Sequence, residues 1–346
     1  MKKFLSAIAA LSVLTAALAG CGSSASTTTT TAATTAAATA AVTEAAAQGN
    51  GSEYKVAIVQ QLDHISLDEI RLAMEAELDK KAAEKGITIT YKEFNGQNDA
   101  TVLNQIGAQV VSDQYDAILP IATLAATTMA TATEETKTPV IYAAISDPAS
   151  SELTGIANVT GTSDALNTQQ IMDMLFAVQP NVETVGLLYS NSEINSATPI
   201  AQAKEYLDAK GIAYIEKTGN STDEILTAAS ALVGRVQAVF TPTDNTVMAA
   251  AGAVAEIFNE AGIPFYTGAD SFVTAGAFTT CGVNYSELGA YTADMAVDIL
   301  LGGEIPEYHV MDGGIITVNT DTAKALGLDY SPFSTMAGTV KEVTTE

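Results

Sequence analysis

From Tyr54 onward, short apolar runs rich in β-branched residues alternate with longer amphipathic stretches. The stretch Asn98–Asp113 repeats apolar residues at Val102, Ile106 and Val110, which is the spacing of one helix face. Short apolar runs between such stretches are typical of strands that are buried on both faces. The runs that we expect to be strands are Lys55–Val59, Ile87–Phe94, Ala117–Ile121, Val140–Ile145, Val185–Tyr189, Ile212–Glu216, Ala238–Phe240 and Pro264–Tyr266.

One local unit occurs three times, at Lys85-Gly86-Ile87, Lys210-Gly211-Ile212 and Ala261-Gly262-Ile263. In each, the glycine is suited to end a helix, and a strand follows directly. Repeated strand–helix–strand units predict right-handed parallel crossovers and therefore an α/β fold. The pattern restarts near Thr184 after a first set of strands ends near Val159, so we expect two lobes. A single long parallel sheet is the alternative.

The first fifty residues have a different character. A positive start at Met1–Lys3 and an apolar run from Phe4 to Leu18 are typical of a secretory signal peptide. The run ends in Leu-Ala-Gly-Cys at residues 18–21, which resembles the bacterial lipobox, in which the Cys21 thiol receives diacylglycerol. An ordinary signal peptide with a chance cysteine is the alternative.

Residues 23–47 are almost wholly Ser, Thr and Ala. Such a segment has no apolar periodicity from which to build a core, so we expect a disordered spacer, with transient helix as the alternative. The sequence thus predicts an extracytoplasmic bacterial protein that is tethered to the cell membrane by a lipid on Cys21.

Composition and charge exclude several classes of partner. The 346 residues carry 40 acidic and 15 basic side chains, for a formal net charge of −25. Nucleic acid is therefore excluded, because its phosphates require clusters of Lys and Arg. The two cysteines, Cys21 and Cys281, are too few for a disulfide framework or a four-cysteine metal site.

Polar residues gather where the predicted strands end, and ligands of open α/β sheets bind beyond these carboxyl ends. The segments contain no Lys or Arg, and both arginines, Arg71 and Arg235, are expected on the surface. An ammonium group would suit the carboxylates in these segments, and helix N-termini could hold a carboxylate, so a zwitterion fits. The alternative is that the Asp and Asn residues only cap helices. The segments are Gln60–His64, Phe94–Gln97, Ile121–Thr123, Ile145–Pro148, Ser190–Glu193, Thr241–Asn245 and Gly268–Phe272.

Catalytic and cofactor motifs are absent from the sequence. It has no G-x-S-x-G elbow, no phosphate loop, no G-x-G-x-x-G after the first strand and no zinc-ligand cluster. We expect Cys281 to be a small buried residue and His309 to be structural, whereas His64 follows the first strand and points to the cleft. A glycosidase pair formed by Asp244 and Asp270 is the weaker alternative. The sequence therefore predicts no enzyme, no catalytic residue, no metal and no cofactor.

Seven motifs occur in order between Tyr54 and Asp329. They are Val59–Asp68, Ile118–Thr123, Ile145–Pro148, Asn158–Asp164, Gly186–Ser190, Pro242–Val247 and Gly282–Gly289. Together they resemble those of TrpX-like (tryptophan/tyrosine-type) substrate-binding lipoproteins of ABC importers. The resemblance implies the type 1 periplasmic binding protein fold, which is an α/β fold with two Rossmann-like lobes, parallel sheets and a three-segment hinge.

The resemblance also implies a division of the chain. The signal peptide would occupy residues 1–20, and the lipidated cysteine and linker residues 21–53. Lobe 1 would comprise residues 54–159 plus 282–305, lobe 2 residues 160–281 plus 306–331, and a C-terminal tail residues 332–346. The chain would cross between the lobes near Asn158–Thr160, Gly282–Asn284 and Glu304–Val310.

The function implied by the resemblance is capture of a small ligand, an amino acid, between the lobes and its delivery to ABC permease and ATPase subunits. Asp270 or Asp244 would hold the ammonium group, and groups near Thr123 and Ser190 the carboxylate. The implied ligand contacts are His64, Thr123, Asp147, Ser190, Asp244, Asn245 and Asp270.

Two departures lie in the implied ligand shell. The chain has Ser-Asn-Ser-Glu at residues 190–193, where the family often has Asn-Pro-Ser-Glu. Phe272 follows Asp270 where many relatives have a smaller residue, and it would either stack on a ligand ring or narrow the pocket. A ligand-presenting sensor and a receptor for a nucleoside or sugar remain as alternatives to amino-acid import.

Overall fold

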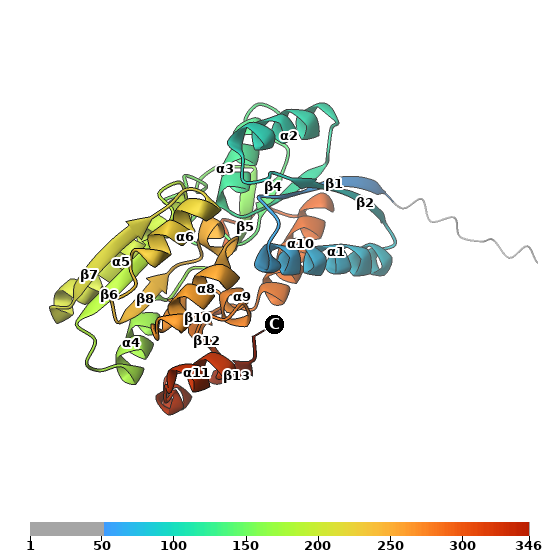
Figure 1. Cartoon of the computed structure of the whole chain (residues 1–346). Helices are drawn as coiled ribbons and strands as arrows, with labels where there is room; N and C mark the ends of the chain where they lie inside the picture. Colours follow the sequence, from blue (N-terminus) through green and yellow to red (C-terminus); the bar gives the residue numbers. More distant parts are fainter. Residues whose placement is uncertain (1–51, 346) are drawn as a thin grey trace, which may run out of the picture. The chain divides into compact units, whose positions relative to one another are not determined.

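The computed structural model describes residues 52–345 (Figure 1). The expected signal peptide 1–20, Cys21 and all but the last two residues of the expected linker 21–53 lie outside them. Within the described residues, no helix has the combination of length and apolar character that crossing a membrane requires.

The first lobe is built on a six-stranded sheet in which every paired neighbour is parallel. Its strand order is β11-β5-β4-β3-β1-β2. The strands are β1 (Glu53–Gln60), β2 (Thr88–Asn95), β3 (Ala117–Ile121), β4 (Val140–Tyr142), β5 (Val159–Ser163) and β11 (His309–Val310).

The second lobe is built on a seven-stranded sheet with the order β13-β12-β10-β9-β8-β6-β7. Its one antiparallel pairing joins β10 to β12. The strands are β6 (Thr184–Tyr189), β7 (Ala213–Thr218), β8 (Ala238–Thr241), β9 (Phe265–Thr267), β10 (Thr279–Gly282), β12 (Ile315–Asn319) and β13 (Thr339–Val343). Two separate sheets confirm the two-lobed α/β fold and exclude the single long sheet.

Helices cover both faces of each sheet, which is why the strands read as continuous apolar runs. In lobe 1, α1 and α10 pack side by side on one face, and α2 and α3 cover the other (Figure 1). The helices are α1 (Ile65–Lys85), α2 (Ala100–Ser112), α3 (Thr123–Ala132), α4 (Thr168–Val178), α5 (Ile194–Lys210), α6 (Thr222–Ser230), α7 (Asn245–Met248), α8 (Ala251–Glu260), α9 (Asp270–Thr274), α10 (Tyr285–Leu300), α11 (Thr320–Leu326) and the 3₁₀ turn η1 (Ser331–Thr335).

Alternate strand residues enter the two halves of each core. Along β3, Leu119 packs with the α1 and α10 side, and its neighbour Ile118 packs with the α2 and α3 side. In lobe 2, Val239 of β8 joins the α6 and α8 side, whereas Phe240 joins the α4 and α5 side. Each strand thus anchors helices on both faces and leaves its carboxyl end free for a site.

The chain passes between the sheets three times, at residues 164–167, 283–284 and 311–314. The first and third crossovers lie later than the sequence predicts, because β5 and β11 both pair within the first sheet. Lobe 1 therefore includes residues 160–163 and 309–310, which the sequence reading assigned to lobe 2.

The expected tail 332–346 is also corrected, because it forms part of lobe 2. Strand β13 pairs with β12 along its whole length, and Phe333 of η1 is fully buried. The sequence gives little indication of this edge strand, because only two of its residues, Val340 and Val343, are half-buried and the others are exposed.

Close packing of α1 against α10 makes Gly289 a sensitive position. A Cβ added there would clash with the Ile70 carbonyl oxygen and would lie 2.9 Å from Ala73 Cβ. We expect Gly289→Ala to lower the free energy of unfolding by roughly 1–3 kcal/mol in urea denaturation, because the helices must separate. Gly252→Ala in α8 is the control, since its nearest new contact is 4.0 Å away; equal losses in both variants would contradict the packing argument.

Candidate ligand-binding site

A cavity lies between the lobes, where the carboxyl ends of strands from both sheets meet. Its empty space, open solvent included, is about 360 Å³. The segments that follow β1, β3, β4 and β5 line it from lobe 1, and those that follow β6, β8 and β9 line it from lobe 2. The cavity therefore occupies the place that the parallel-sheet rule predicts.

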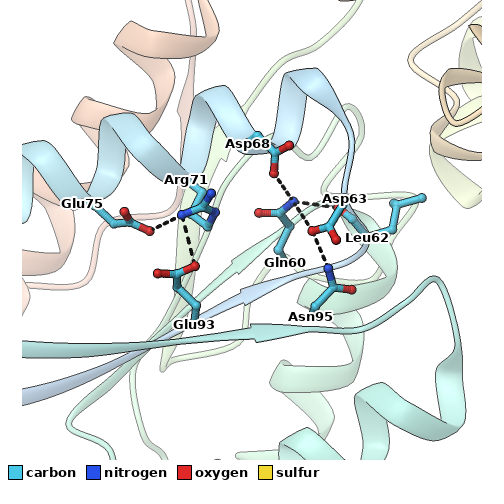
Figure 2. Close-up of polar contacts among 8 residues, drawn as sticks. All are labelled: Gln60, Leu62, Asp63, Asp68, Arg71, Glu75, Glu93 and Asn95. Carbon is cyan, nitrogen blue, oxygen red and sulfur yellow. Dashed lines mark hydrogen bonds and ion pairs between the residues drawn. The ribbon is translucent and has the colours of Figure 1, made fainter.

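The segment between β1 and α1 is shaped by Gln60, the last residue of β1 (Figure 2). Its Nε2 donates to the Leu62 carbonyl and to Asp68 Oδ1, both at 2.8 Å. These bonds tie the loop to the first turn of α1 and so fix the backbone that carries His64.

The two arginines lie away from the cavity. Arg71 pairs with Glu75 at 2.7 Å and with Glu93 at 3.1 Å, which links α1 to β2 (Figure 2). Arg235 is exposed in the loop before β8. Among the described residues that line the cavity, none is Lys or Arg.

His64 lines the cavity and bonds across it to the other lobe. Its Nε2 is 3.1 Å from Asn245 Oδ1, and Asn245 Nδ2 donates to Glu193 Oε2 at 2.8 Å. Burial lowers the pKa of His64 and outweighs the bond from Asn245. The ring is therefore neutral near pH 7, and its buried Nδ1 has no partner within the described residues.

Asp164 is a lining residue that sequence reasoning missed. Ser146 Oγ and Tyr285 Oη donate to its carboxylate at 2.9 and 3.0 Å, and burial raises its pKa. It directly follows β5, so the strand-end rule could have found it. The sequence prediction placed a crossover at Asn158–Thr160 and did not include the end of this strand among the strand-end segments.

Asp244 also lines the cavity, but it serves its own lobe as the cap of α7. Its carboxylate accepts from the Ser190 backbone N–H at 2.7 Å, Ser196 Oγ at 2.7 Å and the Val247 N–H at 2.9 Å. Burial raises its pKa despite these bonds. The hydrogen bonds of Asp244 are therefore those of a helix cap, which is the alternative to ligand contact that the sequence left open.

Three of the expected contacts do not line the cavity. Ser190 gives its backbone N–H to Asp244, and its hydroxyl group bonds Ser192 and Asn220. The other two are Asp147 and Asp270.

Asp147 joins the lobes beside the cavity. It accepts bonds from Thr198 of α5 at 2.7 Å and from the backbone N–H and hydroxyl group of Ser150. Burial acts to raise its pKa, but these donors outweigh burial and lower it.

Asp270, an expected ammonium contact, does not line the cavity. Asp270 begins α9, and its Oδ2 lies 3.4 Å from Lys341 Nζ on β13. Its neighbours Ala269 and Phe272 line the cavity instead. The sequence could not show this, because the partner strand was read as a tail.

Thr123 and Asn195 complete the polar lining. Thr123 begins α3 and is almost fully buried, after Ala122, whose φ of 75° is rare outside glycine. Asn195 Nδ2 donates to the Thr243 carbonyl at 2.7 Å, whereas its buried Oδ1 has no partner within the described residues. Asn195 was missed by sequence reasoning, although it follows the expected segment Ser190–Glu193 directly.

The rest of the lining is apolar and partly aromatic. Leu67, Met248, Phe272 and Tyr285 contribute large side chains from both lobes. Phe272 is 1% exposed and packs edge-to-face on Phe265 with ring centroids 6.2 Å apart. The cavity thus combines polar acceptors with a preformed apolar surface.

Direct hydrogen bonds join the lobes around the cavity. The hydroxyl groups of Ser146 and Thr243 are 2.9 Å apart, and Gln61 Nε2 donates to Glu193 Oε1 at 3.3 Å. A further bond joins Ser66 to Ser271. The structure is therefore a closed arrangement of the two lobes.

Glu193 should make the stability of the protein depend on pH. Burial, followed by the nearby Asp244 carboxylate, raises the pKa of Glu193 to about 7. Between its ordinary pKa and about 7, the folded protein holds a proton that the unfolded chain releases. We therefore expect the free energy of unfolding of the wild type, relative to Glu193→Gln, to fall as pH rises from about 4.5 to 7 and then to level off.

Chemical denaturation at several pH values measures this difference. Glu205→Gln is the matched control, because it makes the same chemical change on the exposed face of α5. A pH profile for Glu193→Gln that parallels the wild type would contradict the assignment.

Comparison with known proteins places this geometry in context. The family model described as "ABC transporter substrate binding protein" matches residues 55–338. A protein named "Tyrosine-binding protein" from Clostridioides difficile (strain R20291) is 30% identical over 281 residues, which cover 79% of this chain and 81% of that protein.

Two solved structures have similar identity. An ABC domain in complex with L-Trp from Streptococcus pneumonia is 30% identical with a TM-score of 0.78, covering 84% of this chain and all of that one. A substrate-binding protein with adhesive properties from Clostridium difficile, in its ligand-free, open structure, is 31% identical with a TM-score of 0.64, covering 85% of this chain and all of that one.

Proposed function

Because the chain belongs to the family of ABC transporter substrate-binding proteins, we propose that it captures an amino acid between its two lobes for import. The observation that carries this proposal is the cavity itself: it has unpartnered acceptors, buried carboxylates and no Lys or Arg among its described lining residues. Such a surface favours a ligand that brings its own positive group.

The ammonium group of the ligand would lie among acceptors from both lobes. Asn195 Oδ1 and His64 Nδ1 are buried atoms without a partner, and each is costly to leave unpaired. Asp164 adds a buried carboxyl group at the same cavity. An ammonium group would satisfy these acceptors and favour the ionised form of Asp164.

The carboxylate of the ligand would lie at the start of α3. Backbone N–H groups at a helix N-terminus attract anions, and Thr123 adds a hydroxyl group at this position. The neighbouring N–H of Leu124 is already bonded to Gln61 Oε1 at 2.9 Å, so Thr123 is the group with which we place the carboxylate.

The apolar surface favours an aromatic side chain on the ligand. Phe272, Met248 and Tyr285 provide ring and thioether contacts. Two relatives that are 30% identical to this chain support an aromatic ligand: one was solved in complex with L-Trp, and the other is named a tyrosine-binding protein. Similar sugar-binding structures are only 13–15% identical and support the fold alone.

The remaining parts of the proposal come from the sequence and the family. We propose that residues 1–20 are a lipoprotein signal peptide and that Cys21 carries the lipid anchor, with a linker extending to residue 53. The protein would act outside the cytoplasm and deliver its ligand to ABC permease and ATPase subunits, as a binding protein and not an enzyme. Presentation to a signalling receptor is the alternative use of the same site.

Isothermal titration calorimetry against amino acids, nucleosides and sugars tests the proposed ligand class. We expect binding of aromatic amino acids, and an affinity about 10- to 100-fold lower in Asp164→Asn, because a bond to a charged group contributes roughly 1.5–3 kcal/mol. Asp270→Ala is the control and should bind as the wild type does, since Asp270 faces Lys341. Binding of nucleosides or sugars without any amino acid would overturn the proposal.

A further inference from the structure

We propose that Glu193 is a positioning residue for ligand capture. By holding Asn245 in one orientation, it fixes His64 of the opposite lobe in the tautomer that presents Nδ1 as an acceptor. It can do so only when the lobes are closed. This inference rests on the proposed function, because it places the ligand beside His64.

The first step is the orientation of the Asn245 amide group. A side-chain amide has one acceptor oxygen and one donor nitrogen. Asn245 Nδ2 lies 2.8 Å from Glu193 Oε2, so the amide oxygen faces His64 Nε2 at 3.1 Å. The reverse orientation would bring the amide oxygen against the carboxylate, acceptor against acceptor, which Glu193 thereby excludes.

The second step is the tautomer of His64. Because Asn245 Oδ1 only accepts, Nε2 of His64 must carry the proton. Burial keeps the ring neutral, so Nδ1 retains its lone pair, and this atom is buried without a partner in the described part of the chain. The ring therefore offers an acceptor to a donor on the ligand, as an ammonium group requires.

The third step is the link to closure. Glu193 and Asn245 belong to lobe 2, and His64 belongs to lobe 1. The other carboxylate oxygen of Glu193 accepts from Gln61 Nε2 of lobe 1 at 3.3 Å. Gln61 is oriented in turn, because its Oε1 accepts from the Leu124 N–H. Separation of the lobes would break both bonds and release His64 to exchange tautomers.

The charged surroundings explain why Glu193 suits this role. Asp244 on its own lobe is the neighbouring carboxylate, and His64 is the titratable group that faces the chain of bonds from lobe 1. Three donors bond Glu193, from Gln61, Asn245 and, at 3.4 Å, Thr246. They favour the charged form, but burial and Asp244 outweigh them and raise the pKa of Glu193 to about 7. The orientation of Asn245 described here therefore holds above this pH, where Glu193 is a carboxylate, and the measurements below are made there.

Nitrogen NMR of ¹⁵N-histidine-labelled protein saturated with its amino acid tests the proposal. The chain has only two histidines, so His309→Gln assigns the His64 signals. In the wild type we expect the His64 proton on Nε2. In Glu193→Gln the new amide can donate to Asn245, which then turns its own amide nitrogen toward His64, and we expect the proton to move to Nδ1.

Affinity gives the second measurement. We expect Glu193→Gln to weaken amino-acid binding about 10-fold or more, and to affect a des-amino analogue of the same ligand much less. Glu205→Gln is the matched control, on the exposed face of α5, the helix that Glu193 precedes. Asn245→Ala releases His64 while it leaves Glu193 in place, so it should lose a similar affinity and serve if Glu193→Gln does not fold.

The outcomes separate the two proposals. An unchanged tautomer and affinity in Glu193→Gln, with a wild type that binds amino acids, would overturn the positioning role alone. A wild type that binds no amino acid would overturn the proposed function and the ligand role of His64. Because Glu193 acts only between closed lobes that hold a ligand, that result would overturn its positioning role as well.

Discussion

Three buried carboxylates, Asp164, Glu193 and Asp244, meet at the cleft, and none forms an ion pair within the described residues. Burial of a charge without a partner is costly, so each carboxylate must be surrounded by hydrogen-bond donors. The arrangement of these donors determines the site. Asp244 fixes the start of α7, Asp164 holds Tyr285 of α10 at the hinge, and Glu193 links the lobes.

Parallel sheets explain why these groups gather in one place. Helices cover both faces of each sheet, so the strand ends are where the chain can offer polar groups to a ligand. Two alanines on this edge, Ala122 and Ala144, have φ values of 75° and 57° and line the cavity. Such strain persists where surrounding structure enforces it and is common at ligand sites. The packed sheets and helices therefore form the cavity and also hold these two alanines in an unfavourable backbone conformation.

Only some of the expected ligand contacts that follow strands line the cavity. His64, Thr123, Asp244 and Asn245 lie in the predicted strand-end segments, the family resemblance implies them as ligand contacts, and they line the cavity. Ser190 and Asp270 follow the same rule, but their hydrogen bonds and ion pair are made within lobe 2. The rule gives the edge of the sheet on which a residue lies. It does not give the direction of a side chain, which depends on neighbours that are distant in the sequence, such as Lys341 for Asp270.

By itself, the sequence determined the α/β class, the two lobes, the polar edge without basic residues and the family, because periodicity and motifs are local. The tertiary structure alone decided that β5 and β11 belong to the first sheet and that residues 339–343 form an edge strand. It also decided that Asp244 caps a helix, whereas the buried acceptors without a partner in the described part of the chain belong to His64 and Asn195. These outcomes depend on pairing between residues far apart in the chain, such as Gln61 and Glu193, and no local pattern of hydrophobic and polar positions encodes that pairing.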